Sequence, residues 1–230
     1  VFPSASAKQF INREDVDAAM NRDVGQINYS RTVAILGVDV AREGDDRSAI
    51  ATKIGRDCTM PLKVFRGLDG PQLGMQVLMY ANELKQKGIP RVYINLDYTG
   101  VGASPYDWLK DKVQHLNKVI SASQSTNPQR WANKRAEMWD KMRDFIRDDG
   151  VIPKSEELAE DLCIPEKLID QKGRLLLESK DSMKRRGMNS PDTADALALC
   201  FAIPIQEYIE DDSWRHQRIN RHKGIRDPYA

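Results

Sequence analysis

The chain has 230 residues, with 35 Lys and Arg against 34 Asp and Glu, so its formal net charge at pH 7 is only +1. This balance excludes a protein that coats nucleic acid through overall positive charge, and any nucleic-acid surface must be a local patch. No run approaches the roughly 18 apolar residues of a transmembrane helix, so we expect no membrane partner.

The first third of the chain predicts a linker, a short helix and three strands. Residues 1–30 open with a segment typical of a linker, and Asn12 or Asp15 is suited to cap a short helix that ends at Met20. The short connections between the strands indicate an antiparallel meander. Apolar, β-rich runs place these strands at residues 32–40, 47–56 and 62–67.

Helices and strands alternate over the rest of the chain. Apolar residues recur at helical spacing over residues 71–87, and Gly88 is a helix stop signal. The strand predicted at residues 91–96 follows this helix, so we expect it to run parallel to the first strand. The further predicted elements are a helix at 102–112, a strand at 119–120, a helix at 131–148, a hairpin turned at 171–173 with its second strand at 175–177, and a helix at 192–203.

This order of elements is that of the RNase H-like fold, an α/β architecture in which α-helices flank a mixed central β-sheet. We expect one such domain over residues 31–205. The polar, weakly basic residues 206–230 are expected to form a flexible tail.

Four aspartates stand where the predicted hydrophobic elements end or begin. Asp39 lies in an apolar strand, where an unpaired carboxylate is costly, and Asp97 ends the fourth strand. Asp192 and Asp195 are three residues apart at the start of the last helix, so they project from one face. Because ligands bind beyond the carboxyl ends of the strands in open sheets, we expect the carboxylates to converge there.

Each aspartate taken alone also has a structural explanation. Asp39 is explained by a partner in the core or by a turn at the strand end, and Asp97 by N-capping of the next helix. Asp192 is suited to N-cap the last helix, but capping leaves Asp195 unexplained. Asp45 follows a glycine in a predicted hairpin turn, so a solvated turn is its default interpretation.

Carboxylates gathered in this way repel one another unless positive charge lies between them. Mg²⁺ and Mn²⁺ take oxygen ligands, and two such ions held by aspartates are typical of phosphodiester cleavage. We therefore expect two Mg²⁺ or Mn²⁺ ions, with Asp39, Asp97, Asp192 and Asp195 in catalytic and metal-binding roles and Asp45 as a lesser ligand. One ion would activate a water and the other would stabilise the leaving 3′ oxygen, so no histidine base is needed.

Two basic clusters are candidates for contacts with the phosphates of DNA, although such a cluster is often only a solvated face. One precedes the last helix, and the other surrounds the helix at 131–148, where Trp131 and Trp139 are expected to pack rather than to stack on bases. The candidates are Lys180, Lys184, Arg185 and Arg186 in the first cluster, and Arg130, Lys134, Arg135, Lys141 and Arg143 in the second.

Three motifs of the chain have a counterpart in one known family. They are Gly37-Val38-Asp39 with the Gly-Asp-Asp loop that follows, the stretch from Leu96 to Ala103, and Glu178-Ser179-Lys180 running on to Leu197, of which Ser190-Pro191-Asp192-Thr193-Ala194-Asp195-Ala196 is the most specific part. These motifs resemble the C-terminal nuclease domain of the large terminase subunits, the DNA-packaging motors of tailed bacteriophages. The resemblance spans residues 32–203.

The resemblance implies a metal-dependent endonuclease that cuts double-stranded viral DNA concatemers during headful packaging, by two-metal phosphodiester hydrolysis. It matches Asp39, Asp97 and Asp195 to the acidic triad of the family and Asp192 to an additional acid of the metal site. Which of Asp192 and Asp195 dominates stays open. Asp45 matches an acidic loop position that sometimes assists.

The resemblance also implies a cellular context. The chain begins at Val1 and has no phosphate-binding loop of the NTPase type, so we expect a piece of a longer chain whose N-terminal ATPase domain precedes residues 1–30. The implied partners are double-stranded DNA, the portal protein and the small terminase subunit, in the cytoplasm of an infected bacterial host.

Two other functions stay open at this point. A Holliday-junction resolvase of the RNase H-like class also carries two aspartates three apart before an apolar helix, and it would prefer four-way junctions over linear duplex. A non-catalytic module that docks to DNA or to the portal would be expected to lack one or more of the acids, and none is missing here.

Overall fold

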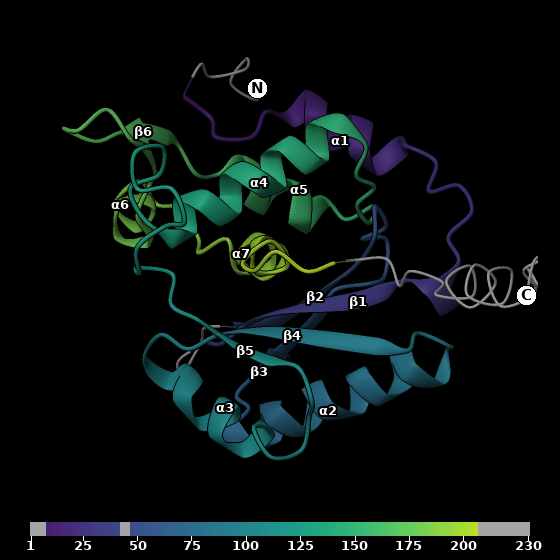
Figure 1. Ribbon diagram of the computed structural model, residues 1–230. Helices are drawn as coiled ribbons and strands as arrows, with labels where there is room; N and C mark the ends of the chain where they lie inside the picture. The colour runs from purple at the N-terminus through teal and green to yellow at the C-terminus, as the bar shows by residue number, and fades with distance from the viewer. Residues whose placement is uncertain (1–7, 42–46, 207–230) are drawn as a thin grey trace, which may run out of the picture.

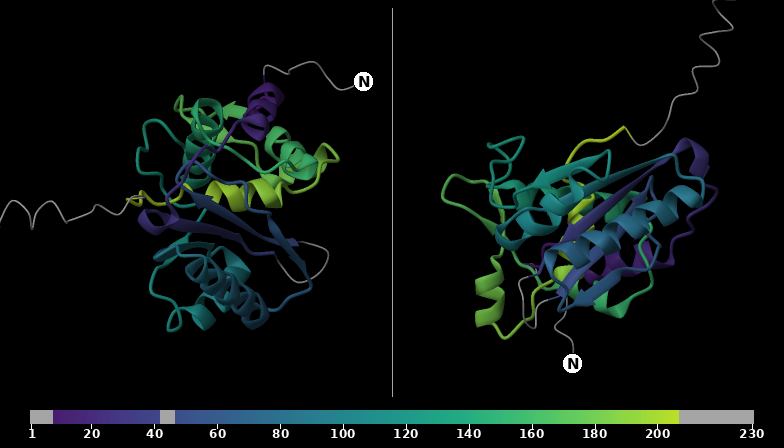
Figure 2. Two further views of the ribbon diagram at one scale, coloured as in Figure 1. Left: turned by 90° about the vertical axis from the view of Figure 1, so that its right-hand side faces the viewer. Right: turned by 90° about the horizontal axis from the view of Figure 1, so that it is seen from below.

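A five-stranded mixed sheet separates two layers of helices in the computed structural model, which describes residues 8–41 and 47–206 (Figure 1). The left view of Figure 2 shows the same layering from a second side, and the right view looks onto the layer that contains α2. The strands of this sheet are β1 (Val33–Asp39), β2 (Arg47–Ile54), β3 (Lys63–Arg66), β4 (Arg91–Asp97) and β5 (Leu116–Val119). The helices are α1 (Arg13–Asn21), α2 (Gly70–Gln86), α3 (Ala103–Leu109), α4 (Lys134–Asp148), α5 (Glu156–Cys163), α6 (Lys180–Arg185) and α7 (Asp192–Leu199).

The strand order of the sheet is β3-β2-β1-β4-β5. Strands β1, β2 and β3 pair antiparallel, as the predicted meander requires, while β4 lies parallel to β1 and to β5. A separate hairpin pairs β6 (Lys167–Ile169) with β7 (Leu175–Leu177). The predicted RNase H-like architecture, a mixed central sheet flanked by helices, is confirmed.

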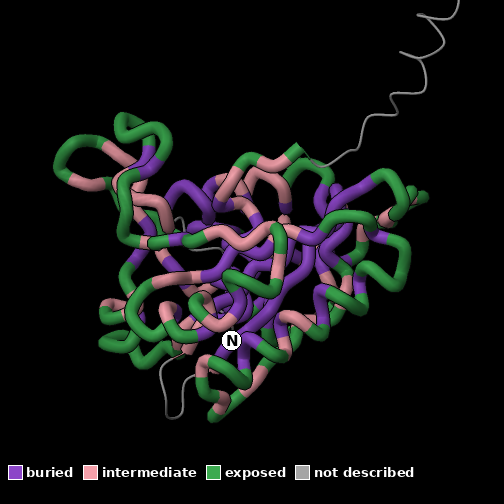
Figure 3. The backbone as a smooth tube through the Cα atoms, turned by 60° about the horizontal axis from the view of Figure 1, so that its bottom comes forward, coloured by how far each residue is buried: buried purple, intermediate pink, exposed green. Residues whose placement is uncertain are grey.

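The pleat of β1 decides which layer each of its side chains faces. Leu36 and Val38 pack in the core formed with α2, whereas Ile35 packs in the core formed with α7 and α4. Because side chains alternate along a strand, Gly37 and Asp39 lie on the same face as Ile35. Figure 3 shows that buried backbone fills the middle of the molecule and that exposed segments surround it. The carboxylate of Asp39 is therefore directed to the α7 layer.

Helix α7 lies in unusually close contact with β1. A Cβ atom added at Gly37 would stand 1.9 Å from the carbonyl oxygen of Ala196, so only glycine permits this approach. At the other end of the helix, the side-chain amide of Asn95 donates a hydrogen bond of 2.8 Å to the carbonyl of Leu199. These contacts bring the first turn of α7 beside the end of β1.

Several predicted boundaries are wrong by a few residues. Helix α4 begins only at Lys134, because the side chain of Asn133 caps it, so Trp131 lies before the helix. The last helix ends at Leu199 instead of residue 203, α3 is shorter than predicted at both ends, and β5 begins three residues before the strand expected at 119–120. Helices α5 and α6 were not predicted. Helix α6 has only six residues, too few to show a period, whereas α5 does carry Leu158, Ala159 and Leu162 at helical spacing after the capping residue Ser155, so that signal was available and was missed.

The described part of the segment predicted as a linker packs into the domain. Phe10, Val16 and Ala19 are buried, and the ring of Phe10 lies edge-on to Trp139 with 6.2 Å between centroids. Its link to a preceding ATPase domain stays a prediction. Asp45 and residues 207–230 lie outside the described residues. None of the helices that the structure describes is long and apolar enough to cross a membrane.

Replacing Gly37 by alanine should destabilise the domain. The new methyl group would collide with the backbone of α7, and overpacking of this kind costs about 1–3 kcal/mol of unfolding free energy. Urea denaturation of Gly37→Ala against the unchanged chain measures this cost. Gly187→Ala is the comparison, because φ is +74° there and no atom stands within 4 Å of the added methyl group, so it reports backbone strain alone. Equal unfolding free energies for Gly37→Ala and the unchanged chain would contradict the packing argument.

Candidate active site

The four predicted aspartates converge where β1 and β4 end and α7 begins. Asp39 and Asp97 are the last residues of two neighbouring parallel strands, whose register places them side by side. Asp192 and Asp195 both lie in the first turn of α7. Asp39, Asp192 and Asp195 are buried, with 5%, 8% and 7% of their surface exposed, and Asp97 is half-buried. The expected convergence of carboxylates is thus present in the fold.

The ammonium group of Lys180 lies among three of these carboxylates. Its Nζ is 3.0 Å from Oδ2 of Asp195 and 3.7 Å from the nearest carboxylate oxygens of Asp39 and Asp192. Burial alone would lower the pKa of Lys180, but the surrounding carboxylates outweigh it and raise the pKa. Lys180 therefore supplies the positive charge that the gathered aspartates require.

The carboxylate of Asp195 is held in a fixed orientation from α4. The guanidinium of Arg135 donates two hydrogen bonds to it, from Nε to Oδ1 at 3.0 Å and from Nη2 to Oδ2 at 3.1 Å. Trp139, one helical turn further, donates its indole N–H to Oδ1 at 2.9 Å. Burial would raise the pKa of Asp195, but Arg135 and Lys180 lower it overall, so this carboxylate is ionised.

Asp39 is the least compensated acid of the group. Burial is the main cause that raises its pKa to about 7, and the charges of Asp195, Asp97 and Asp192 add to the rise. Lys180 acts in the opposite direction without cancelling it. A buried carboxylate with this deficit attracts a further cation.

Two of the structural explanations offered for the aspartates are wrong. Asp97 caps no helix, since its Oδ1 accepts hydrogen bonds from the backbone and hydroxyl of Thr99 at 3.0 and 2.6 Å, within a turn. Asp192 is the first helical residue of α7, and the N-cap position belongs to Pro191. Gly102 approaches the Asp97 carbonyl so closely that an added Cβ would stand 1.8 Å from it.

The donor set fits hard divalent cations. As the side chains stand, no three carboxylate, histidine or cysteine groups in the described part of the chain are gathered tightly enough to ligate one ion. The Lys180 ammonium lies among Asp39, Asp192 and Asp195, and Arg135 donates to both oxygens of Asp195. The Lys180 ammonium marks a position that a cation takes, and its side chain is 40% exposed and so has a path to solvent. Aspartate oxygens are the ligands that Mg²⁺ and Mn²⁺ prefer.

Comparison with known proteins gives matches in structure only. The sequence matches no family model and no curated protein. The nuclease domain of the large terminase subunit gp2 of bacterial virus Sf6 superposes with a TM-score of 0.68 at 21% identity, covering 85% of this chain and 99% of that one. The large terminase nuclease of thermophilic phage G20c with bound magnesium gives 0.60 at 10% identity, over 86% and 98%. The fold is that of the large-terminase nuclease domains.

A third terminase structure is informative about the ions that such a domain accepts. It is a lysine-to-alanine variant of the Sf6 nuclease domain with manganese, which superposes with a TM-score of 0.66 at 21% identity, over 85% of this chain and 99% of that one. At these identities the terminase likeness establishes the fold of the present chain, and its chemistry has to be argued from its own residues.

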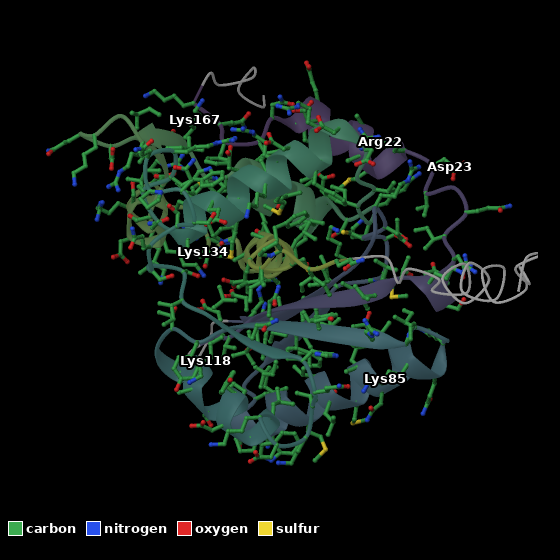
Figure 4. The ribbon with its side chains drawn as sticks, viewed as in Figure 1. Arg22, Asp23, Lys85, Lys118, Lys134 and Lys167 are labelled. Carbon is green, nitrogen blue, oxygen red and sulfur yellow. The ribbon has the colours of Figure 1, made fainter. Side chains whose placement is uncertain are left out.

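Most of the basic residues predicted to contact DNA form ion pairs within the terminase-type fold. Figure 4 labels one of them, Lys134, on the side where β4 ends and α4 begins. Only Lys184 and Arg185 among the candidates lie exposed in the last turn of α6 and outside the ion pairs found in the described residues. The pairs are Arg130 and Arg143 with Asp140, Lys134 and Lys141 with Glu137, Arg135 with Asp195, Arg186 with Glu178, and Lys180 with the aspartates of the site.

Sequence reasoning missed three residues that shape the site. It assigned Lys180 and Arg135 to DNA and Trp139 to packing alone, although all three contact Asp195. One signal was available, because Arg135 and Trp139 are four residues apart and so share one helix face. A second signal was electrostatic, since converging buried carboxylates require nearby cations whichever elements supply them.

The metal-free protein should gain stability when Asp39 cannot ionise. With a pKa near 7 in the folded state against 3.8 ordinarily, ionisation of Asp39 disfavours folding as the pH rises through this window. The cost in folding free energy of ionising Asp39 is complete above pH 7 and is absent below pH 3.8, the ordinary pKa of the carboxyl group. Asp39→Asn should therefore raise the unfolding free energy by up to about 4 kcal/mol at pH 8 in EDTA, with a smaller gain at pH 5.

Urea unfolding at the two pH values measures this difference. The control is Asp107→Asn, an exposed aspartate on α3 whose ion pair is with Lys110. A metal-free Asp39→Asn protein that is less stable than the unchanged chain at pH 8 would show that Asp39 is already fully compensated.

Proposed function

We propose that this chain is a divalent-metal-dependent endonuclease that cuts double-stranded DNA during viral genome packaging. The observation that carries the proposal is the convergence of Asp39, Asp192 and Asp195 on the ammonium group of Lys180, with Asp97 beside Asp39 at the end of the neighbouring strand. The terminase-type fold supports it, because the solved relatives are nuclease domains and one of them holds magnesium. Four carboxylates from three elements are more than a structural ion pair needs.

Asp39, Asp97 and Asp195 are the proposed ligands of the two ions, and different elements fix their positions. Asp39 and Asp97 offer oxygens from the rigid ends of paired strands, so their positions do not depend on a loop. Asp195 is oriented by Arg135 and Trp139 and is a fixed ligand. When bound, Mg²⁺ or Mn²⁺ supplies the charge that activates water for attack on phosphorus and stabilises the leaving 3′ oxygen.

Asp192 has a different role from Asp195 in this proposal. Its oxygens lie 3.7 Å from Lys180 and 3.8 Å from Arg47, distances too long for hydrogen bonds, so its lone pairs are available to an ion. We therefore assign Asp195 as the anchored ligand and Asp192 as the ligand that adjusts when an ion binds.

The position of the site suits a long substrate. The carboxylates lie beyond the carboxyl ends of the inner strands β1 and β4. We propose that a duplex approaches the molecule at this end of the sheet. The exposed Lys184 and Arg185 of α6 lie on the helix that begins at Lys180, and they are the proposed contacts to DNA phosphates. A hollow of about 500 Å³ between β3 and α2 lies on the opposite face of the sheet and has no part in this function.

The wider context follows from the terminase likeness and belongs to the same proposal. The substrate would be concatemeric viral DNA, cut before and after headful filling in the cytoplasm of an infected bacterium. An ATPase domain of the same longer chain, the portal protein and the small terminase subunit would be the partners.

Cleavage of supercoiled plasmid tests the proposed reaction. The chain should linearise and degrade plasmid in Mn²⁺ or Mg²⁺ and not in EDTA, and Asp39→Ala or Asp97→Ala should lower the rate at least about 100-fold because metal ligands are lost. Asp107→Asn, which changes a distant exposed carboxylate, should cut as the unchanged chain does. Agarose gels over a time course give the rates.

Each other outcome of the plasmid experiment has a defined meaning. No cutting with either metal would contradict nuclease activity in this chain and favour a docking module. A strong preference for four-way junctions over linear duplex, measured in parallel, would favour the resolvase alternative. Near-normal cutting by Asp39→Ala would overturn the site assignment.

Removing the Lys180 charge should make the site bind metal more tightly. The ammonium competes with an ion for oxygens of Asp39, Asp192 and Asp195, and methionine keeps the chain length without the charge. Lys180→Met should therefore strengthen Mn²⁺ binding about tenfold, measured by isothermal titration calorimetry. Lys184→Met, on the exposed face of the same helix, should leave the affinity unchanged. Weaker Mn²⁺ binding in Lys180→Met would show that the lysine supports the site instead of competing with the ion.

Loss of the exposed charges of α6 should weaken DNA binding without affecting the metal. The double variant Lys184→Ala, Arg185→Ala removes two phosphate contacts, so the slope of log affinity against log salt should fall by about 2. Fluorescence anisotropy with a labelled duplex in Ca²⁺ measures it at several salt concentrations. An unchanged slope would place the DNA elsewhere on the surface.

A further inference from the structure

The amino end of α7 lacks a capping side chain of its own. Its N-cap residue is Pro191, which offers no side-chain acceptor to the first backbone N–H groups. Within the segment itself, the N–H of Asp192 is bonded to the Ser190 carbonyl at 2.9 Å and that of Asp195 to the Pro191 carbonyl at 2.8 Å. A helix without a cap tends to fray in its first turn, and in α7 that turn carries Asp192 and Asp195.

Asp161 of α5 provides the missing cap from another helix. Its Oδ2 accepts the backbone N–H of Thr193 at 3.1 Å and the Thr193 hydroxyl at 2.6 Å. Asp161 is 5% exposed and Thr193 is fully buried, so water does not compete for either bond. Hydrogen bonds to an ionised acceptor are among the stronger ones. Thr193 stands between the two acids of α7, and fixing it fixes the turn that carries both.

Helix α5 is held in place by core packing and by an ion pair. Its Leu158, Ala159 and Leu162 are buried in the core shared with α7. Glu157 on the same helix forms an ion pair with Arg47 of β2, and the Arg47 guanidinium faces Asp192. Asp161 therefore holds α7 from an element anchored independently of the strands that carry Asp39 and Asp97.

We propose that Asp161 is a positioning residue that sets the direction of the Asp192 and Asp195 carboxylates by capping α7 at Thr193. This inference rests on the proposed function, in which these carboxylates bind divalent ions. Asp161 itself does not touch the ions or the DNA. It acts through the first turn of α7, where a rotation of the helix start would swing both carboxylates out of register with the strand ends.

Two substitutions separate the cap from the charge. Asp161→Ala removes the acceptor, whereas Asp161→Asn keeps an oxygen that accepts both bonds from Thr193 and loses only the charge. In the 230-residue chain, Asp161→Ala should weaken Mn²⁺ binding and plasmid cleavage by about 10-fold or more, the usual effect of losing a group that orients a ligand. Asp161→Asn should restore most of both. Calorimetry with Mn²⁺ alone and the plasmid assay give the two readouts.

Amide hydrogen exchange provides a readout that needs no metal. In EDTA, Asp161→Ala should speed exchange at the first-turn amides of α7, and Asp161→Asn should not. Glu160→Ala is the matched control, because Glu160 is the neighbouring exposed acid on α5 and should change none of the three measurements.

The outcomes distinguish the two proposals. If the unchanged chain binds Mn²⁺ and cuts DNA but Asp161→Ala only melts at a lower temperature with normal Mn²⁺ affinity, Asp161 is a stabilising residue and the positioning role is overturned. Equal losses in Asp161→Ala and Asp161→Asn would also overturn it, since charge and not capping would then matter. Failure of the unchanged chain to bind Mn²⁺ at all would instead remove the proposed function on which the inference rests.

Discussion

The contact between the backbones of β1 and α7 is the constraint on which the rest of the site depends. Gly37 lets the Ala196 carbonyl approach the strand to a distance that any side chain would prevent. As a result, the first turn of the last helix lies level with the ends of the two central parallel strands. Strand pairing brings Asp39 and Asp97 together, and the close contact at this glycine brings Asp192 and Asp195 to them from a distant part of the sequence.

This convergence has an electrostatic cost that the fold only partly offsets. Lys180 neutralises part of the charge, and Arg135 with Trp139 secures Asp195, but Asp39 is left with a pKa near 7. Buried charges with imperfect partners are seldom retained for stability alone. Under the proposed function, the same deficit that weakens the metal-free fold would supply the binding energy for a divalent ion.

The groups that orient the acids come from elements outside the central sheet. Helix α4 supplies Arg135 and Trp139, α6 supplies Lys180, and α5 supplies Asp161. The strand ends and the first turn of α7 thus set where the carboxylates are, while side chains of α4, α5 and α6 set how they point. Terminase nuclease domains share this fold at 10–21% identity to the present chain, since apolar layers tolerate substitution as long as volume and pattern are kept.

The sequence by itself determined the fold class, the antiparallel meander, the parallel crossover strand and the four aspartates. These features depend on local patterns, namely hydrophobic periodicity and the position of a charge at the end of an apolar run, so they can be recognised without knowing what packs where. The resemblance of three short motifs to the terminase nucleases rested on the same local residues. A helix of six residues such as α6 is too short to show a period in this way, whereas the pattern of α5 was present and was missed.

Only the tertiary structure decided which charges meet. Lys180 was expected on a DNA-binding face and instead lies among the aspartates, and four of the other basic candidates pair with Asp140 or Glu137 on α4. The reason is physical: an ion pair or a remote cap such as Asp161 on Thr193 joins residues whose separation along the chain is arbitrary. A sequence pattern records the local structure that each residue prefers, and the packing of the layers chooses its partners.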